Sequence, residues 1–258
     1  MTRWSVAALL GAALLGSGCA TTGDRAPRTE AAASQEEAAR INTDLGISYF
    51  RQGRIELALE RLTRAVEQDR RYARAHAALA VVYQQLEEPA DAERHFRAAL
   101  RLSERDPELW NTYGVFLCGQ GRFDEAEGFF RRASRDRLYP RPDLVLTNAG
   151  MCMREKGDLE AAEGYLREAL ERNPRFPEAL LQMASLSLTT NNLMGARAFL
   201  QRYFAASAVS AESLWLGVQI ERGLGDERTA REYASRLRDD FADSAQAREL
   251  LESQRDER

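Results

Sequence analysis

The amino-acid sequence predicts an all-α fold, in which about six helix–turn–helix units stack into a right-handed superhelix. Three observations favour this fold. Ala, Leu, Glu and Arg are abundant and only 7 of the 258 residues are proline, which suits helices. A pattern of small and large residues recurs with a step of about 34 residues along most of the chain. Glycines recur in the middle of the repeated unit, where one helix would end before the next begins.

The N-terminal segment has the pattern of a secretory signal. Arg3 precedes an apolar run at 4–15, which is too short to span a bilayer permanently and is followed by small residues. Ser17 and Gly18 stand directly before Cys19. This arrangement resembles the lipobox of bacterial lipoproteins, although Gly16 stands where that family usually has a leucine or similar residue. The resemblance implies that residues 1–18 are removed and that Cys19 carries lipid.

The residues after Cys19 predict the location of the mature protein. Several acyl chains would anchor it firmly. Ala20, rather than an aspartate, follows the cysteine, which in the lipoprotein pattern implies the outer membrane and its periplasmic face. Residues 19–37 lack apolar periodicity and are expected to form a lipidated flexible tether. The alternative is an ordinary signal peptide that ends beside a cysteine by chance.

The repeated unit places a small residue at a fixed distance before a large apolar one. The spacing is that of two antiparallel helices, whose close approach requires a small residue opposite a large one. One such unit cannot cover its own apolar face, so copies must stack. In the first four copies the small residues are Gly46, Ala80, Gly114 and Gly150, and the large ones are Leu62, Phe96, Phe130 and Leu166.

The recurrence of these residues at near-constant spacing identifies the unit as a tetratricopeptide repeat. Gly53, Gly121 and Gly157 occupy the turn, where positive φ is expected, and Glu87 replaces the glycine in the second copy. The fifth and sixth copies are looser, as expected near the end of an array. The predicted repeats span 39–72, 73–106, 107–140, 143–176, 177–210 and 211–244, within a repeat domain at 38–246 followed by a C-terminal tail at 247–258.

The sequence contains no catalytic constellation. His76 and His95 are its only histidines, they fit no metal spacing, and they are interpreted as packing or helix-surface residues. The net charge of −4 is well mixed, which argues against nucleic-acid binding. We therefore expect a protein-binding scaffold and not an enzyme, with no metal, no cofactor and no small-molecule substrate.

The resemblance to tetratricopeptide repeats implies a groove lined by the first helix of each unit. A mixed apolar and arginine-bearing groove suits an extended or helical protein segment. The alternative for each apolar residue is that it only packs between repeats. The family's groove-facing positions correspond here to Ile47, Phe50, Val81, Gln84, Val115, Met151, Arg154, Leu181 and Trp215.

Cys118 and Cys152 are expected to form a disulfide, which an oxidising compartment would preserve. They lie one repeat length apart, but an insertion of Arg141 and Pro142 precedes the fourth repeat. The insertion rotates one cysteine by about 200° relative to the other, so that the two side chains can face each other. Gly119 and Gly150 are expected to allow the close approach of the two Cα atoms. The alternative is a pair of buried free thiols.

A lipobox followed by six such repeats resembles the PilF/PilW family of type IV pilus biogenesis and stability lipoproteins. The similarity extends to N-T-Y-G-V-F-L-C at 111–118, T-N-A-G-M-C at 147–152 and L-W-L-G-V-Q-I-E-R-G-L-G-D at 214–226. It implies a role in the localisation and multimerisation of the outer-membrane secretin of the pilus system, which would be the protein partner. The competing hypothesis is a general periplasmic lipoprotein scaffold in cell-envelope assembly.

Overall fold

A computed structural model of the protein describes residues 30–256, which form thirteen α-helices and no strand. No helix in this range is both long enough and apolar enough to span a bilayer. Cys19 and the signal segment at 1–18 lie outside the described residues. The helices are α1 (Glu30–Arg51), α2 (Ile55–Gln68), α3 (Ala73–Gln85), α4 (Pro89–Leu102), α5 (Pro107–Gly119), α6 (Phe123–Ser134), α7 (Pro142–Lys156), α8 (Leu159–Arg172), α9 (Pro177–Thr189), α10 (Leu193–Ala206), α11 (Ala211–Gly223), α12 (Glu227–Asp240) and α13 (Ala245–Asp256).

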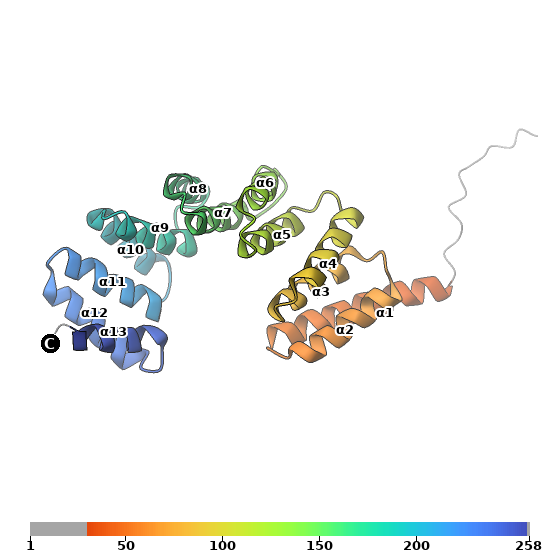
Figure 1. The fold of residues 1–258 in the computed structure, drawn as a ribbon, viewed down its shortest axis with the longest axis horizontal. Helices are drawn as coiled ribbons and strands as arrows, with labels where there is room; N and C mark the ends of the chain where they lie inside the picture. The colour runs from red at the N-terminus through yellow and green to blue at the C-terminus, as the bar shows by residue number, and fades with distance from the viewer. Residues whose placement is uncertain (1–29, 257–258) are drawn as a thin grey trace, which may run out of the picture.

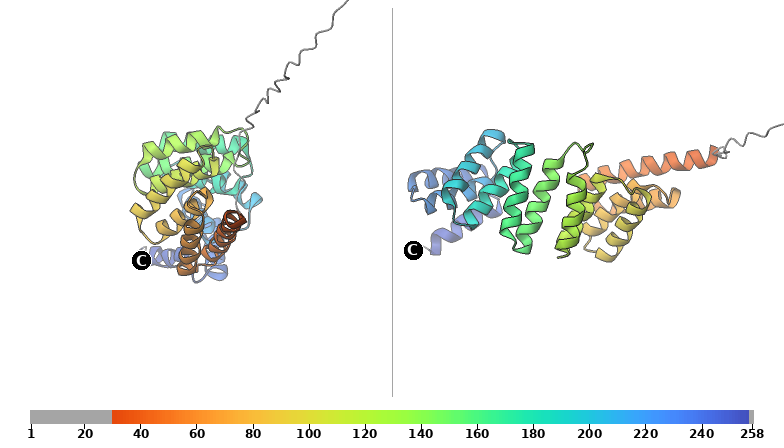
Figure 2. Two further views of the ribbon diagram at one scale, coloured as in Figure 1. Left: turned by 90° about the vertical axis from the view of Figure 1, so that its right-hand side faces the viewer. Right: turned by 90° about the horizontal axis from the view of Figure 1, so that it is seen from above.

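The helices pair in chain order, from α1 with α2 to α11 with α12, and the six pairs stack one after another. The stack curves into an open arch, with α5–α8 at its crown and the terminal helices at its two feet (Figure 1). A second view shows that the N-terminal part of α1 extends beyond the neighbouring helices (Figure 2). The prediction of a superhelix of about six helix–turn–helix repeats is confirmed.

Small residues allow the two helices of a pair to approach closely, as the spacing within the repeated unit predicts. A Cβ atom added at Gly114 would lie 2.7 Å from the Phe130 ring, which leaves no room for a side chain there. The sixth pair follows the same rule at the same offset along the chain, because a Cβ at Gly217 would lie 2.7 Å from the ring of Tyr233. The last repeat is therefore a regular unit, although its glycine comes one residue early in the sequence.

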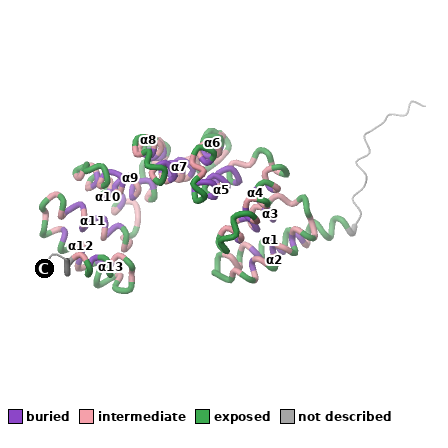
Figure 3. The backbone as a smooth tube through the Cα atoms, viewed as in Figure 1, coloured by how far each residue is buried: buried purple, intermediate pink, exposed green. Residues whose placement is uncertain are grey.

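The buried residues concentrate along the faces where helices meet (Figure 3). A continuous core runs from the second pair to the sixth. Between the second and third pairs it consists largely of aromatic rings, since the ring of Phe96 on α4 lies 5.4 Å from that of Tyr113 and 5.1 Å from that of Phe116 on α5. The connection between these two pairs therefore runs mainly through α4 and α5.

The two ends of the stack differ. Ile41 and Leu45 on α1 are 48% and 40% exposed, whereas the corresponding residues of the second repeat, Ala75 and Leu79, are buried against the first repeat. At the other end, α13 packs on α11 and α12. Its residue Leu250 is fully buried. The stack is thus capped at its C-terminal end, while the outer face of α1 has no neighbouring helix within the described range.

Two boundaries predicted from the sequence were wrong. The predicted tether reaches residue 37, but α1 already begins at Glu30, because the alanine- and glutamate-rich residues that follow favour helix. The predicted tail at 247–258 is mostly covered by α13. Ser244 starts this helix by accepting a hydrogen bond from the Ala247 backbone N–H at 3.1 Å, and apolar residues three positions apart then face α11 and α12.

The turn glycines have the positive φ that the sequence predicts, with Gly121 at 72°. In the second repeat Glu87 adopts φ 60° in the same place, and in the fifth repeat Asn191 adopts φ 58°. A glutamate in this left-handed conformation is strained by contact between its Cβ and the following carbonyl oxygen, whereas asparagine tolerates it better.

Replacing Glu87 with glycine should therefore stabilise the protein by about 1 kcal/mol, because glycine has no Cβ to strain. Gly121→Ala should destabilise it by a similar amount. An added Cβ at Gly121 meets no atom within 4 Å, so that change tests the backbone alone. Urea unfolding measures both changes in the free energy of unfolding, as shifts of the urea midpoint with an unchanged m-value. A lower urea midpoint for the Glu87→Gly variant would contradict this account of the turn.

Candidate protein-binding groove

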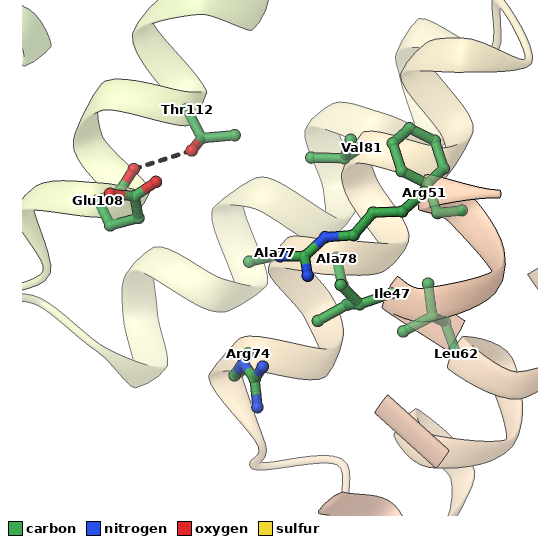
Figure 4. Close-up of a pocket in the computed structure, with 10 residues that line it drawn as sticks. Ile47, Arg51, Leu62, Arg74, Ala77, Ala78, Val81, Glu108 and Thr112 are labelled. Carbon is green, nitrogen blue, oxygen red and sulfur yellow. Dashed lines mark hydrogen bonds between the residues drawn. The ribbon is translucent and has the colours of Figure 1, made fainter. Parts of the chain in front are cut away.

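A cavity of about 340 Å³ opens between α1, α3 and α5. Its apolar wall includes Leu62 from α2, together with Ile47, Ala77, Ala78 and Val81, which are labelled in Figure 4, and Phe50. Apart from Leu62, these residues belong to the first helices of their repeats, Ile47 and Phe50 to α1 and the other three to α3. The middle first helices α5 and α7 lie on the inner side of the arch, as Figure 1 shows for α5 below α6. Three of the residues at the family's groove positions, Ile47, Phe50 and Val81, thus form part of the cavity wall.

Two further cavities continue from the first. One of about 360 Å³ shares Phe50 and Val81 with it and adds Gln84 and Val115. Another of about 210 Å³ shares Gln84 and Val115 and extends to Met151 on α7. The three cavities thus follow one another along α1, α3, α5 and α7. We call this surface, lined by Ile47, Phe50, Val81, Gln84, Val115 and Met151, the inner groove.

The inner groove exists because α3 and α5 diverge. First helices of other neighbouring repeats, such as α5 and α7, approach each other along their backbones, but α3 and α5 stay further apart. Contact between the second and third repeats runs instead through Phe96 on the outer side, as described above. The space left on the inner side exposes Val115, which is 40% accessible.

Charged side chains stand at the edge of the inner groove. Arg74 pairs with Asp44 at 2.7 Å. Arg51 is exposed, makes no ion pair within residues 30–256, and extends from α1 toward the residues of α3 in Figure 4. Across the cavity, the Thr112 hydroxyl donates to the backbone oxygen of Glu108 at 2.9 Å. The groove thus offers a partner an apolar floor with a free guanidinium at one end.

Three predicted groove residues do not line these cavities. Leu181 is only 8% exposed and belongs to the core, so its prediction as a contact was wrong; the residues at the same position of the third and fourth repeats, Asn111 and Thr147, are buried as well. Arg154 instead donates to the Ser185 hydroxyl at 3.3 Å, from α7 to α9. Trp215 is half-buried against the core of the sixth repeat. The roles of Arg154 and Trp215 in binding stay predictions.

The set of groove residues predicted from the sequence omits several residues that the structure places in the first cavity. Ala77, Ala78 and Thr112 line it although they lie outside the predicted set. Ala77 lies one helical turn before Val81, so helical spacing from that residue indicates its position. The contribution of Thr112 depends on the separation of α3 from α5, which no local pattern reveals.

Cys118 at the end of α5 and Cys152 in α7 are joined by a disulfide, with their Cα atoms 5.7 Å apart. The rotation produced by the inserted Arg141 and Pro142 accounts for their facing each other. The role predicted for the glycines was wrong. A Cβ at Gly119 would meet nothing within 4 Å, and one at Gly150 would meet Leu166 of its own repeat.

The approach of α5 to α7 depends on other contacts. Asn148 on α7 donates to the side-chain oxygen of buried Asn111 on α5 at 2.9 Å. On the second helices, the Tyr165 hydroxyl of α8 donates to Glu127 of α6 at 2.6 Å. These bonds hold the third and fourth repeats together beside the disulfide, which itself lines the last of the three cavities.

Mass spectrometry of the non-reduced protein should show a cross-link between Cys118 and Cys152. Reduction should lower the free energy of unfolding by about 3–4 kcal/mol, because it releases a closed loop spanning a sequence separation of 34 in the unfolded chain. The double variant Cys118→Ser, Cys152→Ser is the control and should not respond to reductant. Free thiols at both positions in protein isolated without reductant would refute the pairing.

His76 on α3 and His95 on α4 form a hydrogen-bonded pair. Their Nδ1 atoms are 3.0 Å apart, and His76 Nε2 donates to the Arg70 carbonyl at 3.1 Å. A carbonyl only accepts, so His76 Nε2 carries a proton; when both rings are neutral, His76 Nδ1 then accepts the proton that His95 Nδ1 donates. The packing role expected of these residues is confirmed. No group of three metal-binding side chains occurs in the described part of the chain.

Burial lowers the pKa of His76, and burial together with the neighbouring His76 ring lowers the pKa of His95 to about 4. Both values lie below that of an unfolded chain, near 6.5. The stabilisation by the pair should therefore be complete above about pH 6.5 and be lost as pH falls toward 4. His95→Gln should flatten this part of the pH–stability profile and leave the slope between pH 7 and 8 unchanged. An unaltered slope between pH 6.5 and 5 would contradict the assignment.

Family models of the tetratricopeptide repeat match residues 37–105, 106–175 and 153–214. The type IV pilus assembly protein PilF of Pseudomonas aeruginosa is 34% identical over 222 residues, which cover 86% of this chain and 87% of that protein. The chain belongs to the PilF/PilW family. The crystal structure of PilW, described as a widely conserved type IV pilus biogenesis factor, superposes with a TM-score of 0.75 at 30% identity and covers 83% of this chain and 98% of that one.

The structure of PilF from Pseudomonas aeruginosa gives a TM-score of 0.71 at 32% identity, over 85% of this chain and 99% of that one. The PilF/PilW resemblance seen in the sequence is thereby confirmed, and with it a role in type IV pilus biogenesis through binding of protein partners.

Proposed function

We propose that this chain is a lipid-anchored scaffold of the outer membrane, which binds a segment of the type IV pilus secretin in the inner groove and promotes secretin multimerisation. Membership of the PilF/PilW family supports the pilus system as the setting. The observation that carries the binding proposal is the continuous inner groove, where Phe50, Val81 and Val115 remain partly accessible although they are apolar.

The anchor is proposed from Cys19, which follows the apolar N-terminal run and two small residues. Acylation there would hold the repeats beside the membrane in which the secretin assembles. With the scaffold fixed in this plane, its effective concentration toward a membrane-bound partner rises without any new contact. The function proposed is therefore binding and placement, not catalysis.

The groove can be tested with the double variant Phe50→Glu, Val81→Glu. Two carboxylates in the apolar floor should abolish docking, because they replace apolar contacts with charges that must lose water when a partner binds. The control is Met194→Glu, Leu251→Glu, which alters two apolar residues that are 64% and 47% exposed and line none of the three cavities. We expect detergent-resistant secretin multimers and twitching motility to fall at least tenfold in the first variant and to persist in the control.

Circular dichroism must show equal helical content in both variants. Normal multimers in a folded groove variant would move the binding site to another surface.

Cys19→Ala should release the protein from outer-membrane fractions, and full retention would refute the anchor. If deletion of the whole chain left motility and multimers intact, a general envelope scaffold would replace the pilus proposal.

A further inference from the structure

The connection between α6 and α7, residues 135–141, presents an apolar side chain to solvent. Leu138 is 93% exposed, more than any other large apolar residue in the described part of the chain. The loop lies where the insertion separates the third and fourth repeats, so the repeat pattern itself does not require this leucine. A leucine so fully exposed contributes nothing to the packing of the stack.

The loop is held in place by two side chains beside Leu138. The carboxylate of Asp136 accepts the backbone N–H of Leu138 at 2.9 Å, which forms a local turn. The hydroxyl of Tyr139 donates to the carboxylate of Glu108 on α5 at 2.6 Å. Leu138 is thus presented by an ordered loop and not exposed by local fraying.

Three arginines surround this leucine. Arg135, Arg137 and Arg141 are exposed, and none makes an ion pair within residues 30–256. The carboxylate of Asp136 is directed to its own backbone turn, as described above. The loop therefore combines an apolar side chain with three arginines and a single carboxylate, although the whole chain carries a net charge of −4.

The topology places this loop on the same edge of the stack as the start of α1. Every first helix begins where the preceding second helix ends, so the N-terminus of α1 and all inter-repeat connections share one edge. These connections contain more arginines than carboxylates, and the turns within the repeats, on the opposite edge, contain more carboxylates than arginines. The inter-repeat connections are 69–72, 103–106, 135–141, 173–176 and 207–210.

We propose that the 135–141 loop docks on the anionic phospholipid surface of the membrane that carries the protein, with Leu138 in the interface and the three arginines on lipid phosphates. The proposal rests on the lipid anchor of the proposed function, which would leave the stack from this edge. Charge complementarity and one apolar side chain suffice for a contact that supplements an existing anchor. A protein partner would need on the order of 1,000 Å² of complementary surface, whereas Leu138 is the one large apolar side chain that this loop exposes.

Docking of this edge has a consequence for the inner groove. The first helices would stand with their N-terminal ends toward the membrane, so the groove, which crosses α1, α3, α5 and α7, would run parallel to the bilayer surface. A secretin segment lying along the membrane could then enter it from the side.

The test uses the full lipidated chain, reconstituted in vesicles and labelled with an environment-sensitive dye at Leu138→Cys. The control label is at Met194→Cys, which replaces a residue 64% exposed at the start of α10, on the opposite edge. In vesicles of phosphatidylethanolamine and phosphatidylglycerol, the dye at position 138 should enter an apolar environment and be quenched by lipid-soluble quenchers. The dye at position 194 should stay aqueous.

The signal at position 138 should fall at least fivefold in vesicles of phosphatidylcholine alone, in about 1 M salt, or when Arg135, Arg137 and Arg141 are all changed to Gln. Equal, aqueous signals from both labels would overturn the proposal. So would an apolar signal at position 138 that appears only after secretin is added, because the loop would then be a protein contact.

Flotation of the protein with vesicles tests the anchor separately. If Cys19 proves unmodified and the protein does not float, the anchor fails. The same vesicles added to the labelled protein in solution then measure the loop by itself, and the absence of any composition-dependent signal would overturn docking as well.

Discussion

The whole structure depends on one steric constraint, namely that a helix pair can close only where a residue without a large side chain faces a large one. At Gly114 the facing ring of Phe130 would lie 2.7 Å from any Cβ, and Gly217 stands in the same relation to Tyr233. This fit sets the tilt within each pair and hence the surface that the pair offers to its neighbour. Because each pair leaves an apolar face uncovered, the next pair must follow, and the curvature of the arch accumulates from these contacts.

The inner groove forms where the packing between neighbouring repeats is less close than elsewhere in the stack. Phe96 draws the second and third repeats together on the outer side, while α3 and α5 separate on the inner side. The third and fourth repeats are joined much more firmly, by the disulfide and by the bond between Asn111 and Asn148. The inner groove thus crosses the loose junction between the second and third repeats and reaches the firm junction between the third and fourth. Its accessible apolar floor therefore lies beside two repeats that are held rigidly together.

Much of this could be predicted from the sequence because it depends on spacing along one chain. The constant offset between the small and the large residue specifies each helix pair, and the insertion before the fourth repeat specifies that Cys118 can face Cys152. Features that depend on how far apart neighbouring repeats lie could not be predicted. Val115 is exposed because α3 and α5 diverge, whereas the burial of Leu181 follows from its position, since the fifth residues of the third and fourth repeats, Asn111 and Thr147, are buried as well. The capping helix α13 also escaped detection, because a single helix has no partner pattern to match.

Because α13 covers only the C-terminal end, the two ends of the stack differ in local stability. In a linear array each unit is stabilised by its neighbours, so a terminal unit with a neighbour on only one side opens most readily. Leu250 of α13 supplies the missing neighbour at the C-terminal end, whereas the outer face of α1, with Ile41 and Leu45, has none in the described chain. Opening should therefore begin at the first repeat and travel inward until it reaches the disulfide between the third and fourth repeats. The repeat that contributes Phe50 to the groove is consequently the most adaptable part of the array, and the disulfide marks where that adaptability ends.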